Sequence, residues 1–377
     1  MTRTKALIAA LALGASTMAL ADITVGVVVP LTGPASGLGI PMQNGVKLWP
    51  SEVAGEKLNV IILDDATDPT KGVQAARRLV TEEKVDVLIG SGATPVAVAI
   101  AEVASETKTP QLSLSPHPLA PGKDAWSFRL PQSNGVMANA IVAHMKKSGV
   151  KSVGFLGYTD AYGESWLNEL KPRLEKAGIE LKGVERFQRT DTSVTGQALK
   201  LVAANPDAMI VVASGSGAAM PQLGLIERGY KGKFYQTHAA ATRDLMRVGG
   251  KAVEGTYVVS GPVVVVEQLP DDHPAKDQGM KYVAAYDKAY GAGMRNQFGA
   301  HSWDGLLLLE KAVPIARQKA QPGTPEFRAA LKDALESIPS IALSHGELDY
   351  TPQDHWGFHP DAGVIMKVVD GDWKLEK

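Results

Sequence analysis

The chain has 377 residues, 45% hydrophobic and 21% charged, which is typical of a globular protein with about two domains. Lys and Arg total 39 against 40 Asp and Glu, and this balance argues against a nucleic-acid partner, because nucleic-acid-binding proteins usually carry a basic excess. The sequence has no Cys, which excludes disulfides, zinc–thiolate sites, iron–sulfur clusters and thiol catalysis.

Residues 1–21 have the pattern of a secretory signal peptide. Two basic residues near the start precede an apolar run from Ala6 to Gly14, and Ala19-Leu20-Ala21 forms a small-residue cleavage site. The run is shorter than the roughly 20 residues that a membrane span needs, so we expect cleavage before Asp22 rather than an anchor. With no Cys after the signal, the mature chain cannot be a lipoprotein, and we expect it to be free in the periplasm.

The mature chain alternates predicted strands and helices in units of about 25 to 30 residues, which is typical of a doubly wound α/β sheet. A β-branched strand at 23–29 leads into a Gly- and Pro-rich loop at 31–41. The next predicted elements are a helix at 43–53, a strand at 58–63, a helix from Pro69 with Asp68 as its N-cap, a strand at 85–89, a helix at 95–106 and a strand at 110–113.

A second, similar set of elements follows. We expect helices at 136–147, 162–177, 197–203 and 220–228, and strands at 152–156, 183–187, 208–212, 233–236 and 253–259. Three more helices are predicted at 277–290, 302–317 and 325–336. The tail predicts antiparallel strands at 346–350 and 364–369, with a return through the turn at 370–372. The sequence therefore predicts two α/β halves.

Motifs for catalysis are missing from the sequence. There is no P-loop and no G-x-S-x-G elbow, and Gly37-Leu38-Gly39 lacks the third glycine of a dinucleotide site. His355 and His359 have a spacing that binds zinc on a helix, but the surrounding Pro and Gly residues predict a surface loop. We therefore expect no catalytic residue, no metal and no cofactor, and keep a secreted α/β enzyme only as an alternative.

The turn at 90–94 is the sharpest candidate for a binding site. It follows a buried strand and precedes the helix that Pro95 opens, and in open α/β sheets ligands bind outside the carboxyl ends of the strands. Free backbone N–H groups and the Thr94 hydroxyl at this place suit a carboxylate. The alternative is that Thr94 is an ordinary N-cap.

A set of short segments occurs in a distinctive order along the chain: 23–34 (ITVGVVVPLTGP), 63–69 (LDDATDP), Leu88-Ile89-Gly90 with Thr94, and pieces at 128–129, 160–163, 253–255 and 303–305. Together they resemble the leucine/isoleucine/valine-binding branch of type I periplasmic binding proteins, which serve bacterial ABC importers. The resemblance covers almost all of the mature chain. It implies two Rossmann-like lobes with parallel sheets, a three-crossover hinge and closure of the lobes around a ligand.

This resemblance also implies how the chain is divided. Residues 1–21 are the signal peptide, 22–135 plus 262–342 form lobe 1, and 136–261 plus 343–377 form lobe 2. The implied partners are a small carboxylate ligand and an inner-membrane ABC permease, and the implied state is a monomer that performs no chemistry. An exported sensor domain, which passes its liganded state to a receptor, is the alternative within the same fold.

The resemblance is carried over to a ligand site one residue at a time. Thr94 stands where a hydroxyl meets the ligand carboxylate, Ala93 lends backbone, and Leu114 and Ser115 complete this clamp. The other candidates are Leu38 over the ligand, Tyr162 pressing from lobe 2, Ser214 in a lobe 2 turn and Phe298 near the rim. For Leu38 the alternative is loop packing, and for Tyr162 it is packing within its own lobe.

Two departures from the family pattern bear on the ligand. The acidic residue that pairs a ligand ammonium is replaced by His238, beside three alanines, and Pro116 stands where a hydroxyl residue is usual. A buried ammonium without a carboxylate partner costs several kcal/mol, whereas His238 can donate to an acceptor. We therefore expect an aromatic or other hydrophobic organic acid, such as a benzoate- or phenylpropanoid-like acid. The alternatives are an amino acid served by Asp244, or an amide or urea-like solute.

Overall fold

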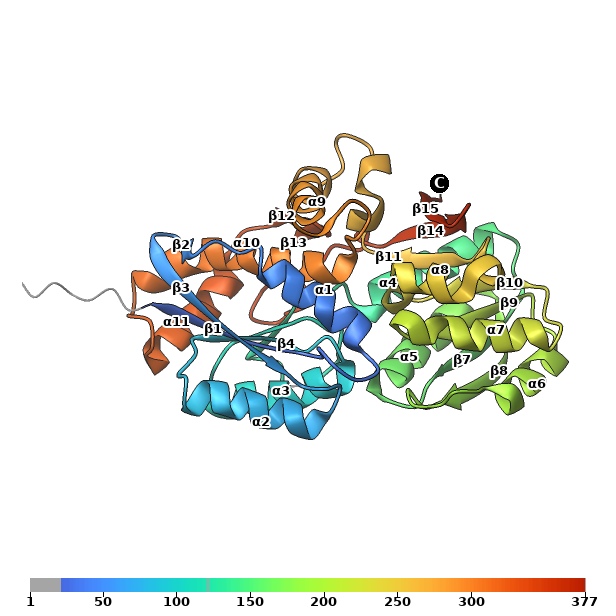
Figure 1. Ribbon diagram of the computed structural model, residues 1–377, viewed down its shortest axis with the longest axis horizontal. Coiled ribbons are helices and arrows are strands. Elements are labelled where there is room, and N and C mark those ends of the chain that lie inside the picture. Colours follow the sequence, from blue (N-terminus) through green and yellow to red (C-terminus); the bar gives the residue numbers. More distant parts are fainter. Residues whose placement is uncertain (1–21, 121, 377) are drawn as a thin grey trace, which may run out of the picture.

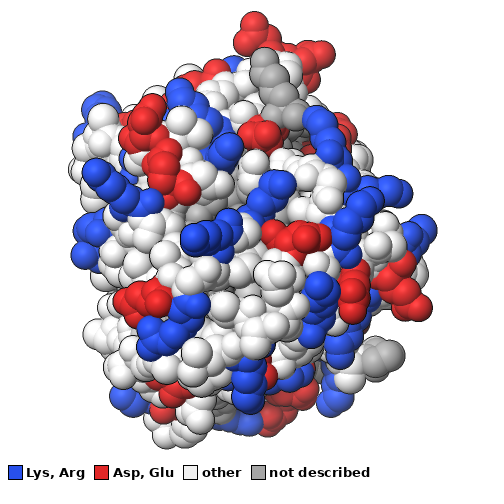
Figure 2. Space-filling model, turned by 90° about the vertical axis from the view of Figure 1, so that its right-hand side faces the viewer, with Lys and Arg blue, Asp and Glu red and all other residues white. Residues whose placement is uncertain are grey.

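The computed structural model describes residues 22–120 and 122–376, which form two α/β bodies side by side (Figure 1). The predicted signal peptide at 1–21 lies outside these residues. Within the described ranges, no helix combines the length and apolar character that a membrane span requires. Acidic and basic side chains are interspersed over the end of the second body (Figure 2).

The first body is built on a six-stranded sheet in the order β2-β3-β1-β4-β5-β6. Its centre, β1, pairs in parallel with β3 and β4, and it is a β-branched run buried on both faces, as the covered strands of parallel sheets are. The bounds are β1 Ile23–Val29, β2 Glu52–Val53, β3 Glu56–Asp64, β4 Val87–Gly90, β5 Gln111–Ser113 and β6 Ser127–Arg129.

Helices cover both faces of this sheet and give it two apolar cores. One core is formed with α2 (Pro69–Thr81) and α3 (Thr94–Thr107), and the other with α1 (Ser36–Val46), α10 (Gln297–Arg317) and α11 (Pro325–Ser337). The predicted cap of α2 is confirmed, because the Asp68 carboxylate accepts from the backbone N–H groups of Thr70 and Lys71.

The second body has a seven-stranded sheet in the order β15-β14-β11-β10-β9-β7-β8. Strands β7 to β11 run parallel, and the predicted antiparallel tail strands β14 and β15 extend the edge beside β11. The strands are β7 Ser152–Tyr158, β8 Glu180–Phe187, β9 Ala208–Val212, β10 Lys233–Gln236, β11 Tyr257–Ser260, β14 Val364–Val369 and β15 Asp372–Leu375; the helices are α4 Asn134–Lys147, α5 Ala161–Ala177, α6 Thr195–Ala204, α7 Ala219–Glu227 and α8 Arg243–Gly249.

Two segments near the predicted lobe boundaries pack in the other lobe from the one expected. The 3-10 segment η4 (Pro262–Gln268) and α9 (Lys276–Tyr290) pack into the core of the second sheet, although residues 262–342 were expected in lobe 1. Conversely, Leu343, Leu348 and Phe358, around the hairpin β12–β13 (Ile341–Leu343 and Gly346–Leu348), belong to a core of the first sheet. We therefore propose that the chain makes its third crossing just before β14, at 362–364, rather than near Leu343.

The first helix is the main local error of the sequence prediction. Residues 31–41 were expected to be a loop and 43–53 a helix, but α1 begins at Ser36 and residues 52–53 pair with 56–57 as a hairpin. The helix begins earlier than predicted because tertiary packing stabilises it: Gly39 and Gly45 have no side chain, so α1 can lie close to the backbone of neighbouring segments. A Cβ at Gly39 would lie 2.0 Å from the Pro30 carbonyl oxygen, and one at Gly45 would lie 2.3 Å from that of Gly299 on α10.

The loop that carries His355 and His359 is also a partial correction. The segment is irregular, as expected, but His355 is buried rather than on the surface: it stacks on Phe128 with ring centroids 3.9 Å apart and its Nε2 lies 3.0 Å from Glu336. No group of three metal-ligating side chains comes together in the described part of the chain.

Candidate ligand-binding site

The turn after β4 is held by its backbone and by a buried carboxyl group. Gly90 has φ +120°, and a Cβ there would lie 1.8 Å from the Val28 carbonyl oxygen, so only glycine fits. The Ser91 hydroxyl donates to Asp65 at 2.6 Å and accepts from the Ala93 backbone N–H. Burial raises the pKa of Asp65 to about 6. These contacts fix the start of α3.

Thr94 and Ser115 form a hydroxyl pair at this edge of the sheet. The N-cap of α3 is Ala93 and Thr94 is the first residue of the helix, so the N-cap alternative for Thr94 is wrong. Its Oγ1 lies 2.6 Å from the Ser115 Oγ, and both side chains are buried. One hydroxyl proton is used in the bond between the two residues, so the pair has one O–H left to donate to a ligand carboxylate, and its oxygens can accept from a ligand donor.

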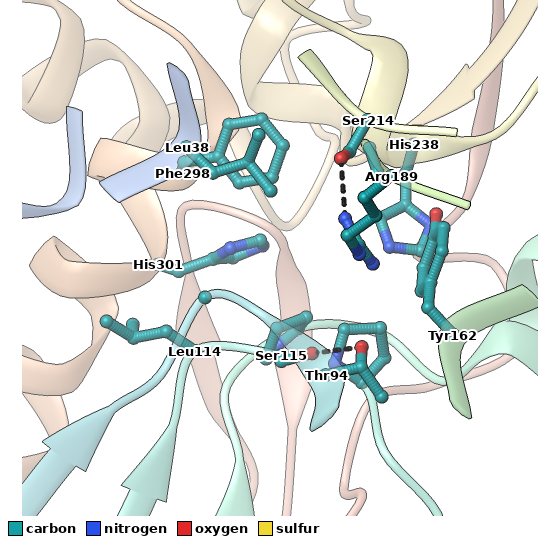
Figure 3. Close-up of a pocket in the computed structure, with 14 residues that line it drawn as sticks. Leu38, Thr94, Leu114, Ser115, Tyr162, Arg189, Ser214, His238, Phe298 and His301 are labelled. Atoms are coloured by element: carbon teal, nitrogen blue, oxygen red, sulfur yellow. Dashed lines mark hydrogen bonds between the residues drawn. The ribbon is translucent and has the colours of Figure 1, made fainter. Parts of the chain in front are cut away.

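A cavity lies beside this pair, between the two bodies (Figure 3). It is lined by Leu38, Gly92, Thr94, Leu114, Ser115, Pro116, Pro131, Tyr162, Arg189, Ser214, His238, Ala239, Phe298 and His301. Eight of the nine sequence-predicted residues are in this set; Ala93, the N-cap of α3, is buried beside Thr94 but does not line the cavity.

The two bodies meet across the cavity at Leu38. Leu38 lies on α1 of the first body, and a Cβ added to Gly215 of the second body would be 3.4 Å from its side chain. Leu38 is 4% exposed; it lines the cavity and also belongs to the apolar core of the first body. Phe298, expected near the rim, is likewise buried inside.

Arg189 is the residue of greatest chemical interest that the sequence analysis missed. It follows β8, and its Nε donates to the Asp160 carboxylate at 2.5 Å while Nη1 donates to the Ser214 hydroxyl at 2.9 Å. The guanidinium also lies 4.2 Å from the centroid of the Tyr158 ring. The available signal was its position just past the carboxyl end of a predicted parallel strand, the same rule that singled out Thr94.

Tyr162 and His238 form the second body's share of the wall. The Tyr162 hydroxyl donates to Thr237 at 2.8 Å, and burial raises the pKa of Tyr162, which keeps the phenol neutral. His238 is buried, and burial lowers its pKa to about 3. Its Nδ1 has no hydrogen-bond partner among the described residues. The imidazole is therefore neutral and free to bind a ligand group.

The cavity has a one-sided charge. Among the described residues that line it, Arg189 is the one charged side chain, with no Asp or Glu. Asp244, the alternative partner for an amino group, lies outside this lining, on α8, and pairs with Arg247 at 2.8 Å. The lining therefore offers a ligand anion one guanidinium, which is already paired with Asp160 behind it, and offers no carboxylate to a buried ammonium.

Comparison with known proteins agrees with this architecture. The sequence model of the periplasmic binding protein family matches residues 22–372. An extracellular ligand-binding receptor from Rhodopseudomonas palustris is 46% identical, with a TM-score of 0.92 over 94% of this chain and 99% of that chain. Leu/Ile/Val-binding protein homolog 3 of Brucella melitensis is 26% identical over 360 residues, 90% of each chain.

A more distant structure has a defined ligand. A solute-binding protein of an ABC transporter from Rhodopseudomonas palustris, in complex with 3,4-dihydroxybenzoic acid, is 24% identical with a TM-score of 0.78, over 93% of this chain and 95% of that chain. At this identity the likeness concerns the fold.

Two lobes with parallel sheets, and a cavity at the carboxyl ends of their strands, define a type I periplasmic binding protein. The chain belongs to the periplasmic binding protein family, in its leucine/isoleucine/valine-binding type, as the sequence resemblance indicated. This is a family of solute-binding proteins rather than enzymes, and its members act in the periplasm.

Proposed function

We propose that this protein is the periplasmic substrate-binding component of an ABC transporter and that it captures an aromatic or other hydrophobic organic acid between its lobes. One observation carries the ligand class: within the described lining, a single Arg stands among hydroxyl, imidazole and apolar groups, with no acidic residue.

The charge argument favours a carboxylate without an amine. Arg189 is held by Asp160 and Ser214 on one side, and its guanidinium points into the cavity (Figure 3). Charge-assisted hydrogen bonds to a carboxylate are about twice as strong as neutral ones, and the Thr94–Ser115 hydroxyl pair can add to them. An amino acid would bring an ammonium group with no described carboxylate to pair it, at a cost of several kcal/mol.

The apolar side chains argue for a hydrophobic body on that acid. Leu38, Leu114 and Phe298 line the side of the cavity away from Arg189 (Figure 3). Burying an apolar ring against such side chains contributes about 25 cal/mol per Å². The relative that binds 3,4-dihydroxybenzoic acid has a ligand of the same chemical class, but our proposal depends on the residues of this cavity.

The transport role follows from the family and the predicted signal. In this proposal residues 1–21 direct export, the mature protein is a monomer free in the periplasm, and closure of the lobes presents the liganded form to an inner-membrane permease. In the sensor alternative, the liganded form binds a receptor instead of a permease. Deleting the gene tests this: transport requires that uptake of the radiolabelled ligand be lost, whereas a sensor leaves uptake in place.

Ligand binding is tested on residues 22–377 by thermal shift. The panel comprises benzoates, cinnamates, keto acids, short amides, urea, and branched-chain and aromatic amino acids. At 100 times its Kd a ligand stabilises the protein by about 2.7 kcal/mol. We expect aromatic acids to raise the midpoint and amino acids to leave it unchanged; the reverse pattern contradicts the proposal. Recovery of the bound acid unaltered separates binding from turnover.

The matched variants are Arg189→Met and Arg186→Met. Arg186 is also on the β8 side of lobe 2, but it pairs with Glu164 outside the described cavity lining. Arg189→Met should weaken acid binding by at least tenfold, and Arg186→Met should leave it unchanged. Equal effects of the two substitutions would show that Arg189 has no direct role.

A further inference from the structure

His301 is a buried side chain whose hydrogen-bonding capacity is unused. It lies on α10, is 1% exposed, and both its Nδ1 and Nε2 lack a partner in the part of the chain that the structure describes. A buried donor or acceptor left unsatisfied costs about 1–3 kcal/mol. A neutral imidazole has one donor and one acceptor, so His301 carries this cost twice unless something in the cavity satisfies it.

The position of His301 is fixed by rings on two sides. Its imidazole stacks on that of His345 with centroids 4.2 Å apart, and Phe298 meets it edge-on at 6.1 Å. His345 is itself held by Asp304, whose carboxylate lies 2.7 Å from its Nδ1. Because its neighbours are held in turn, the orientation of His301 is built into the fold rather than left to the ligand.

His301 lies at the apolar end of the cavity, away from Arg189, the proposed site of the ligand carboxylate. Figure 3 shows its ring pointing into the cavity from the side of Leu38, Phe298 and Leu114, opposite Arg189. Burial lowers the pKa of His301 well below its usual value, so the ring is neutral there. A neutral donor–acceptor pair amid apolar side chains suits an uncharged polar group.

We propose that His301 recognises a hydroxyl group on the ligand, at the end remote from the carboxylate. A hydroxyl donates one hydrogen bond and accepts another, which matches a neutral imidazole. This inference rests on the proposed function and narrows it: the preferred ligands are ring-hydroxylated aromatic acids. Unsubstituted acids fill the same space but leave His301 unsatisfied.

The experiment measures Kd by calorimetry for matched acids: benzoate with 3- and 4-hydroxybenzoate, and cinnamate with 4-hydroxycinnamate. The wild-type protein should bind one hydroxylated member at least tenfold more tightly than its parent. In His301→Phe, which keeps a ring on His345, the ratio of the Kd values of the parent and the hydroxylated acid should fall to about one. In His301→Gln, which keeps a donor and an acceptor, part of the preference should return.

The outcomes separate this inference from the proposed function. If wild-type protein binds parent and hydroxylated acids equally, or His301→Phe keeps the preference, the role of His301 is overturned and the organic-acid function stands. If no acid binds the wild-type protein, the function fails and the inference with it. If His301→Phe does not fold, the ratios of Kd values measured on the wild-type protein decide. They include 4-methoxybenzoate, whose ether oxygen can accept a hydrogen bond but cannot donate one. It should bind more weakly than 4-hydroxybenzoate.

Discussion

Arg189 and Asp160 join the proposed anion site to the start of a helix. One carboxylate oxygen of Asp160 accepts from Arg189 Nε, and the other accepts from the backbone N–H groups of Tyr162 and Gly163 as the N-cap of α5. The same side chain therefore positions the guanidinium and the first turn that carries Tyr162. Its two functions can be separated by mutation.

Asp160→Asn should separate them, because Asn caps helices about as well as Asp but cannot pair with a guanidinium. We expect unfolding free energy within about 1 kcal/mol of wild type and affinity for an aromatic acid roughly tenfold weaker, which is about 1.4 kcal/mol. Asp160→Ala should show the same loss of affinity and lose about 1 kcal/mol of stability as well. Urea unfolding and calorimetry measure the two quantities. Wild-type affinity in both variants would show that Asp160 does not position Arg189.

His238→Glu tests the ligand charge from a second position in the same lobe as Arg189. A carboxylate in place of a neutral imidazole would repel the ligand carboxylate at low dielectric, so acid binding should fall by at least about a hundredfold. The variant should also bind an aromatic amino acid more tightly than wild type does. His238→Gln, an uncharged control, should keep the preference for acids. Unchanged selectivity in His238→Glu would remove His238 from the site.

Gly90→Ala should be severely destabilising because the added Cβ has no space. It would lie 1.8 Å from the Val28 carbonyl oxygen and would occupy φ +120°. We expect a loss of roughly 3 kcal/mol or more. Gly149→Ala is the matched control: its φ is +73° and its Cβ meets nothing within 4 Å, so only the backbone cost of about 1 kcal/mol should appear. Equal losses in denaturant unfolding would contradict the steric argument.

His117 predicts acid sensitivity. Burial lowers its pKa to about 3, while an unfolded His titrates near 6.5, so the unfolded state binds more protons between these values. Stability should therefore fall as pH drops below 6.5, by about 2 kcal/mol at pH 5 from this residue. His117→Asn should reduce the difference in unfolding free energy between pH 7 and pH 5 by that amount. A difference equal to that of wild type would mean that His117 is already protonated in the folded state.

Asp65 contributes the opposite slope over part of this range. Its pKa is raised to about 6, so the folded state binds the extra proton and stability from this group declines as pH rises from about 4 to 6. The comparison between His117→Asn and wild type cancels this contribution because both proteins contain Asp65.

The strands were predictable from local patterns. Those at 23–29, 208–212, 233–236 and 364–369 have the predicted bounds, because each is a short segment rich in β-branched, aromatic or other apolar residues that a sheet buries. The bounds of α1 depend instead on close approaches to Pro30 and to Gly299 of α10, and Gly299 lies 254 positions after Gly45. Local helix propensity does not reveal such contacts.

The site was predictable where a strand-end turn or a family motif marked it. Thr94 follows β4 directly, and Tyr162 follows the cap of α5. Arg189 and His301 were missed because their roles arise only when the loop after β8 and the second turn of α10 meet the same cavity. The sequence places these residues 112 positions apart, and neither lies in a motif.

The most direct test of the account is calorimetry on residues 22–377 with 3-phenylpropionate and L-phenylalanine, two ligands that differ only in the ammonium group. The lining described here contains Arg189 and no acidic side chain, so 3-phenylpropionate should bind at least about a hundredfold more tightly. Tighter binding of L-phenylalanine would contradict the account and return the protein to amino-acid uptake.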